Sequence, residues 1–177
     1  NFFDVDVVTI NMNLVDLKED QNLLESRLYP KLRQEFKKQK YNDLSFNVIN
    51  NKNCNTETIN KYFDSYKKFH FLSAGKVTRP SSSWEAMRED LIDGRSSLFV
   101  IKKMTECLSF LLCFEHKKFS IGASQTNTKN LELLKNYMLR HYLEYKTINY
   151  YKLNEFVYYQ VGHTYFFDKS FKSFEEK

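Results

Sequence analysis

One polar segment, residues 70–84 (HFLSAGKVTRPSSSW), holds the side chains best suited to chemistry. It combines a titratable imidazole, His70, two cations, Lys76 and Arg79, several hydroxyl groups and the single tryptophan, Trp84. An imidazole can accept a proton, an arginine fork can hold a phosphate or carboxylate, and an indole can stack on a sugar or base. We therefore predict a binding site here. The alternatives are a helix cap beside a buried tryptophan, and a histidine that complements a helix dipole.

Motifs for the commonest enzyme chemistries are absent from the sequence. There is no GxxxxGK[ST], GxGxxG, HExxH, GxSxG or CxxC pattern, so nucleotide hydrolysis, Rossmann chemistry and zinc chemistry lose their support. The four histidines are too scattered to suggest a metal site. The three cysteines show no metal-ligand spacing, and we expect them to be reduced thiols rather than disulfides. We predict no metal.

The composition describes one folded domain of 177 residues with a formal net charge of +5. Hydrophobic residues make up 42% and aromatic residues 16%, which is enough apolar surface for a single core and too much for a disordered chain. No apolar run approaches the ~20 residues that a transmembrane helix needs, and no signal-peptide pattern opens the sequence. We therefore expect no membrane insertion and a cytoplasmic location.

Hydrophobic periodicity predicts the elements before and around the polar segment. Alternation over residues 5–14 and over residues 44–49 predicts two strands, and helical spacing over residues 17–40 predicts a helix interrupted by Pro30. A helix that Thr56 or Thr58 caps comes before the polar segment. A second helix, capped by Ser82 or Ser83 and ended by Gly94, follows it. The polar segment should therefore connect two helices.

The second half of the chain predicts a sheet with a crossover. Period-two patterns predict three consecutive antiparallel strands at residues 97–102, 106–114 and 119–123. A helix after Thr126–Thr128 and two strands, at residues 147–151 and 156–161, follow. A strand, helix, strand unit requires a right-handed crossover and a parallel pair. The expected fold is α/β (α+β): a mixed, mostly antiparallel sheet with one parallel β-α-β crossover, flanked by helices.

Two runs, SAGKVTRPSSSWEAMREDLIDGRSSLFVI and LSFLLCFEHKKFSIGASQTNTKNLELLKNYMLRHYLEYKTINYYKL, resemble the acyltransferase domain of the FemAB-like branch of the GNAT superfamily. The resemblance covers about residues 8–155, and its most specific part is Ala74 to Pro80 with Trp84. It implies a single GNAT-like acyltransferase domain at residues 17–177, preceded by an initial strand or linker at residues 1–16. Full FemAB proteins carry two GNAT-like halves, so the resemblance also implies a second half as a possible partner.

The resemblance implies where substrates bind. GNAT-like folds splay two parallel strands apart, and the acyl donor enters the cleft with its phosphates near the N-terminus of the following helix. We expect a slot lined by the serine-rich bend and the start of the crossover helix, although an ordinary Thr or Asn cap would give the same residues. For the reaction of such a domain, His70 is the predicted catalytic base, and the predicted substrate-binding residues are Lys76, Arg79, Trp84, Ser124, Gln125 and Asn127.

The implied function is transfer of an acyl or aminoacyl group to an amine of a cell-envelope or nucleotide-sugar precursor. The donor would be acyl-CoA or aminoacyl-tRNA. A tRNA suits the basic helix from Lys31 to Lys40, and the absence of a glycine-rich phosphate loop weakens the case for CoA. The same basic helix leaves open an alternative function, a noncatalytic nucleic-acid-binding module. Acidic residues before the lysines favour a solvated amphipathic helix instead.

Overall fold

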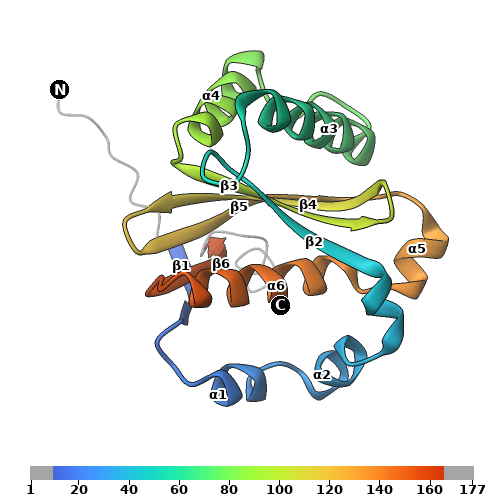
Figure 1. The fold of residues 1–177 in the computed structure, drawn as a ribbon, viewed down its shortest axis with the longest axis vertical. Helices are drawn as coiled ribbons and strands as arrows, with labels where there is room; N and C mark the ends of the chain where they lie inside the picture. The colour runs from blue at the N-terminus through green and yellow to red at the C-terminus, as the bar shows by residue number, and fades with distance from the viewer. Residues whose placement is uncertain (1–9, 166–177) are drawn as a thin grey trace, which may run out of the picture.

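A six-stranded sheet forms the middle layer of the protein, for which the computed structural model describes residues 10–165 (Figure 1). The strand order is β1-β6-β5-β4-β3-β2, and every neighbouring pair is antiparallel except β5 and β6. The strands are β1 (Ile10–Asp16), β2 (Leu44–Ile49), β3 (Ser96–Lys103), β4 (Glu106–His116), β5 (Phe119–Asn127) and β6 (Tyr158–Tyr165). This mixed, mostly antiparallel sheet confirms the predicted fold class.

Helices cover both faces of the sheet (Figure 1). On one face, α3 (Thr56–Ala74) and α4 (Ser81–Ile92) enclose a core built around Phe63, Tyr66 and Phe110. On the other face, α6 (Leu139–Leu153) covers a second core rich in tyrosine. Helices α1 (Gln21–Ser26) and α2 (Pro30–Phe36) lie beyond α6, away from the sheet. The 3-10 turn η1 (Gln39–Asp43) leads into β2, and α5 (Leu131–Asn136) precedes α6 in the chain.

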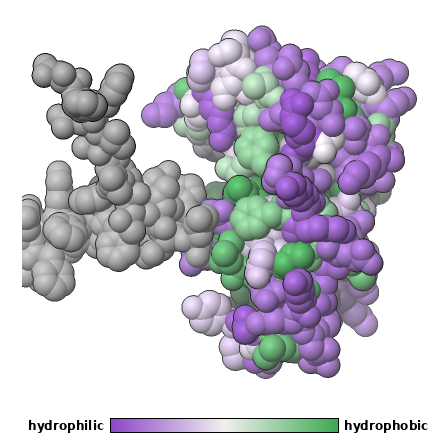
Figure 2. Space-filling model, turned by 90° about the vertical axis from the view of Figure 1, so that its left-hand side faces the viewer, coloured by the Kyte–Doolittle hydropathy of each residue, from purple (hydrophilic) through white to green (hydrophobic). Residues whose placement is uncertain are grey.

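The surface reflects this layering. On the face seen in Figure 2, hydrophobic residues gather at mid-height, at the level of the sheet, and hydrophilic residues dominate the helical layer above it. Between residues 10 and 165, no helix combines the length and apolar character needed to cross a membrane. All three cysteines are free thiols, as expected.

The parallel strands β5 and β6 pair over only three residues of each and then part. Their register runs from Phe119 to Ile121 of β5, although β5 continues to Asn127. The register between β4 and β5 shifts just beyond that point, so that Ala123 forms a bulge. Gly122, next to this bulge, leaves room for a ring of β6: a Cβ atom there would lie 2.8 Å from the Tyr159 hydroxyl oxygen. The sheet therefore forks between β5 and β6.

The predicted strand at residues 147–151 is wrong, because these residues belong to α6. Leu143, Thr147 and Tyr151 recur every four residues and are all fully buried against the sheet. The β-branched and aromatic side chains of residues 147–151 favour a strand locally, but the packing of the buried stripe against the sheet determines the helix. The parallel partner of β5 is instead β6, which overlaps the predicted strand at residues 156–161.

Several predicted helix boundaries also differ. Asn55 and Asn130, rather than the neighbouring threonines, cap α3 and α5 with their side chains. Pro80 is the N-cap of α4, so the helix starts at Ser81 and includes both predicted serine caps. The crossover helix is broken at Tyr137, whose extended backbone allows its ring to be buried.

The predictions for the strand at residues 5–14 and the helix at residues 17–40 are confirmed in part. Residues 17–40 form two short helices with Pro30 at the start of the second, as its ring geometry allows. Residues 5–9 of the first predicted strand lie outside the described residues, and β1 covers the rest as an edge strand paired with β6. The proposed division of the chain at residue 16 stays a prediction.

Candidate functional site

The polar segment is held between α3 and α4 on one face of the sheet. Helix α3 extends to Ala74 and ends at Gly75, whose φ of 68° is left-handed. His70 therefore lies in the last part of α3 rather than in a loop. Its imidazole packs edge-on against two buried rings, with ring centroids 5.7 Å from Tyr66 and 5.4 Å from Trp84. These rings fix the orientation of the imidazole.

Hydrogen bonds join this segment to β5. Nε2 of His70 lies 2.9 Å from Oγ of Ser124, and Nη2 of Arg79 donates to the same oxygen over 3.1 Å. Because Oγ accepts from Arg79, its own proton is free to be donated to Nε2. Nδ1 of His70 then carries a proton and faces Oγ1 of Thr78 at 3.4 Å. The chain of contacts is consistent with a neutral imidazole whose Nε2 accepts.

Electrostatics reinforce the neutral form of His70. Burial lowers the pKa of this half-buried imidazole, and the positive charge of Arg79 lowers it further. The Arg79 guanidinium lies 5.1 Å from the centre of the Trp84 ring, a cation–π contact that holds it next to the imidazole. A neutral histidine at physiological pH can accept a proton, which is the property that a general base needs.

Two hollows flank this cluster. One, of about 260 Å³, is bordered by Lys67, Lys76, Arg79 and Trp84. The other, of about 460 Å³, is open and bordered by His70, the end of β5 and Leu134 of α5. We name them the cationic hollow and the strand-end hollow. No ion pair in the part of the chain that is described involves the three cations of the cationic hollow.

The structure brings four predicted site residues into one hydrogen-bonded or stacked cluster: His70, Arg79, Trp84 and Ser124. Lys76 borders the cationic hollow next to this cluster. Gln125 and Asn127 border the strand-end hollow, but their side chains are engaged elsewhere. The Gln125 amide donates to the Arg140 carbonyl oxygen of α6, and Oδ1 of Asn127 accepts from Ser109.

Sequence reasoning missed three hydroxyl-bearing residues at this site. Thr78 faces His70, and Thr126 donates to Ser73, whose Oγ in turn donates to the Asn127 carbonyl oxygen over 2.9 Å. This second chain of hydrogen bonds ties the end of α3 to the end of β5. A signal for Thr78 was present in the polar segment, but the Ser73–Thr126 pair joins positions 53 residues apart.

The residues that are described hold no group of three or more His, Cys, Asp or Glu side chains that could bind a metal ion. The basic stretch from Lys31 to Lys40 is not one continuous helix, since it is divided between α2 and η1. Glu35 pairs with Lys38 and Lys40, and their hydrogen bonds lower its pKa to about 2. Part of the positive charge is therefore neutralised, which does not favour the nucleic-acid-binding alternative.

The mixed sheet between two helical layers is shared with two solved structures, which confirms the fold that the resemblance implied. The crystal structure of FemX matches with a TM-score of 0.63 and 11% sequence identity, over 88% of this chain and 53% of that chain. The C-terminal domain of a putative lysylphosphatidylglycerol synthetase from Agrobacterium fabrum matches with a TM-score of 0.62 and 12% identity, over 96% and 52%.

This chain thus spans about half the length of the solved structures that it matches. No protein-family model matches the sequence, and no curated protein matches it. At these low identities the likeness establishes the fold, and the roles of individual residues rest on the geometry of the site.

Proposed function

We propose that this protein transfers an acyl or aminoacyl group to an amine in cell-envelope biosynthesis. The observation that carries the proposal is the contact of His70 and Arg79 with Ser124, on the section of β5 that has left β6. The name of one structural relative, a putative lysylphosphatidylglycerol synthetase, joins a lysyl group to a phospholipid, which supports aminoacyl transfer. Phosphatidylglycerol offers hydroxyl groups, so the amine as acceptor does not rest on this relative.

The reaction needs no protein nucleophile. The acceptor amine attacks the carbonyl carbon of the donor ester or thioester, and the proton that the amine loses reaches Nε2 of His70 through the Ser124 hydroxyl, which donates to that nitrogen. Beyond Ile121, β6 no longer pairs with β5, and backbone N–H groups near the end of β5 would stabilise the oxyanion. When the tetrahedral intermediate collapses, the carbon–oxygen or carbon–sulfur bond breaks, and the leaving group takes the proton back from His70.

The two hollows offer separate places for two substrates. Three cations and the uncapped start of α4 suit a phosphate-bearing group in the cationic hollow. Arg79 would bind such a group while Trp84 stacks on a sugar or base. The strand-end hollow, next to His70, would hold the second substrate. To contact it, the Gln125 and Asn127 side chains would have to release Arg140 and Ser109. Acyl-CoA and aminoacyl-tRNA are both compatible donors, because each carries phosphates.

Because the chain spans about half of its structural relatives, we include in the proposal a second GNAT-like half, from the same protein or another chain. This half would complete the acceptor site. An interface of this kind buries roughly 600–1,500 Å² in other proteins.

A ligand screen followed by a transfer assay tests the proposal. We expect one of CoA, acetyl-CoA, a nucleotide sugar or an aminoacyl-tRNA to raise the melting temperature, since a ligand at 100 times its Kd stabilises by about 2.7 kcal/mol. Mass spectrometry would then detect the acylated amine formed from that donor.

Substitutions connect the result to the site. Arg79→Ala should abolish the ligand-induced shift with the melting temperature of the free protein changed by only a few degrees. His70→Ala should keep the shift and abolish transfer. Lys68→Ala is the matched control, because Lys68 is an exposed neighbour of Lys67 outside the hollow. If no donor shifts the melting temperature and RNA binds with a steep salt dependence, the nucleic-acid-binding alternative is correct.

A further inference from the structure

A third hollow, of about 240 Å³, lies on the opposite side of the sheet from His70. It is enclosed by β1, α1 and α6, and Figure 1 shows α1 beyond α6, away from α3 and α4. None of the residues that border it borders the cationic or the strand-end hollow. Its chemistry is therefore independent of the proposed transfer site.

The walls of this hollow are aliphatic. Leu14 and Val15 come from β1, Leu24 from α1, Leu28 from the link between α1 and α2, and Ile148 from α6. None of the five is fully buried, and 50% of Leu14 is exposed. Helix α1 contributes no fully buried residue at all. Apolar side chains thus face one another across this interface without completing the close packing of a core.

Hydrogen bonds bridge the rim. The Gln21 amide donates to Glu25 and to Asn149, both over 3.0 Å, and the Tyr145 hydroxyl donates to Glu25 over 3.2 Å. These bonds link α1 to α6. Since the polar rim groups already have partners, an apolar occupant would leave none of them unpaired.

Both flanks of the α1–α2 segment are anchored to α6, so the hollow has fixed walls. At one flank, the Lys152 ammonium donates to the Leu17 carbonyl oxygen over 2.9 Å. At the other, the Phe36 ring stacks on Tyr145 with centroids 5.3 Å apart.

We propose that this hollow binds an aliphatic chain, the hydrocarbon part of an acyl group or of a long-chain alcohol. A cavity of about 150 Å³ lined by Leu, Ile and Phe is large enough to bind benzene, and this one is larger. Its walls are formed by branched aliphatic side chains, which can pack against a flexible hydrocarbon chain. Arg27, whose side chain is 58% exposed at the rim and paired with Glu19, lies where the polar end of the chain would meet solvent.

Methyl NMR titration with decanol and decanoate tests the proposal. Both ligands should shift the methyl signals of Leu24, Leu28 and Ile148 in a saturable way. The signal of Leu72, which is exposed on the other side of the sheet and borders none of the three hollows, should not move. Equal affinities would show that the chain alone is recognised, and tighter decanoate binding would add a role for Arg27. Shifts spread over all exposed methyl groups would overturn the proposal.

Paired tryptophan substitutions on α1 provide the control. Leu24→Trp fills the hollow and should weaken decanol binding at least tenfold. Leu23→Trp places the same ring on an exposed neighbouring position outside the hollow and should leave binding unchanged. Leu28→Phe is a second filling variant if Leu24→Trp does not fold. Unchanged decanol affinity in the folded filling variants would refute the site, whereas His70→Ala should not affect decanol binding.

Discussion

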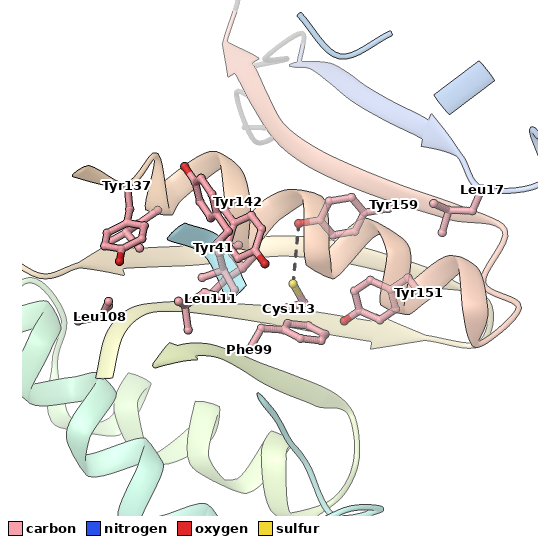
Figure 3. Close-up of a cluster of buried hydrophobic side chains, with 13 residues drawn as sticks. Leu17, Tyr41, Phe99, Leu108, Leu111, Cys113, Tyr137, Tyr142, Tyr151 and Tyr159 are labelled. Carbon is pink, nitrogen blue, oxygen red and sulfur yellow. Dashed lines mark hydrogen bonds between the residues drawn. The ribbon is translucent and has the colours of Figure 1, made fainter. Parts of the chain in front are cut away.

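The two faces of the sheet around β5 meet titratable groups in opposite settings. On the α3–α4 face, Ser124 meets a half-buried imidazole between two open hollows. On the α6 face, the Tyr159 hydroxyl donates to Glu144. The same hydroxyl lies 4.0 Å from the Cys113 sulfur (Figure 3). Tyr159 is fully buried. A ligand can therefore reach the first group, and the second is enclosed by the core.

The candidate reactive groups therefore lie on one face of the sheet, and the groups on the other face are part of the core. Burial raises the pKa of Glu144, whereas burial lowers that of His70, because in each case the charged form loses solvation. The Tyr159 ring packs against Gly122 from the α6 face, next to the fork. We infer that packing on the α6 face determines the shape of the fork, and that the candidate site on the α3–α4 face depends on this shape.

The largest expected effect is on stability, from replacing the two key rings. Tyr159→Ala should lower the free energy of unfolding by about 3–5 kcal/mol, because it leaves a cavity and an unpaired Glu144 in the core. His70→Ala should cost no more than about 1.5 kcal/mol, since the imidazole is only partly buried. Urea denaturation measures both. Similar losses in the two variants would contradict the division between the faces.

The fork itself can be tested by a double-mutant cycle. Gly122→Ala places a methyl group 2.8 Å from the Tyr159 hydroxyl oxygen and should cost about 1–3 kcal/mol. Tyr159→Phe removes that oxygen, so the double variant should be less destabilised than the sum of the single variants by about 0.5 kcal/mol or more. Additive losses in urea would mean that Tyr159 does not limit the space at Gly122.

The pH dependence of stability should have opposite signs on the two faces. Glu144 binds its proton more tightly in the folded state, so its contribution is present below its ordinary pKa of 4.5 and is lost as pH rises through the raised folded value. His70 binds its proton more weakly when folded. Its contribution is present above its ordinary pKa of 6.5 and is lost as pH falls towards the lowered folded value.

Urea titrations from pH 4 to pH 8 would resolve these contributions. Relative to wild type, Glu144→Gln should gain stability as pH rises, and His70→Gln should gain stability as pH falls. Parallel curves for wild type and either variant would show that the environment of that group does not change on folding.

Local patterns predicted the sheet better than the site. Strands β3, β4 and β5 could be recognised because their alternation is long and their turns are short. The contact between His70 and Ser124 could not, because 54 positions separate them and only the packing of α3 on β5 joins them. Residues 147–151 were misassigned because their composition suits a strand while their burial follows a helix.

The candidate site residues could likewise be grouped only by their closeness in the sequence. Arg79 and Trp84 stand close together in sequence, so their shared role could be predicted from the segment. Gln125 and Ser124 are also neighbours, but successive residues of a strand point to opposite faces. Sequence adjacency alone therefore could not show that Ser124 meets His70 while Gln125 contacts α6.

The smallest expected effect concerns the imidazole tautomer. Thr78→Val removes the 3.4 Å contact of Oγ1 with Nδ1 and should change stability by less than about 0.5 kcal/mol, because Thr78 is exposed. Nitrogen-15 NMR should show Nε2 still accepting, since Ser124 remains. Ser124→Ala should disturb that tautomer much more, because it removes the hydroxyl that links Arg79 to Nε2. If Thr78→Val changes the tautomer as strongly as Ser124→Ala, the orientation of His70 is set from the loop and not from β5.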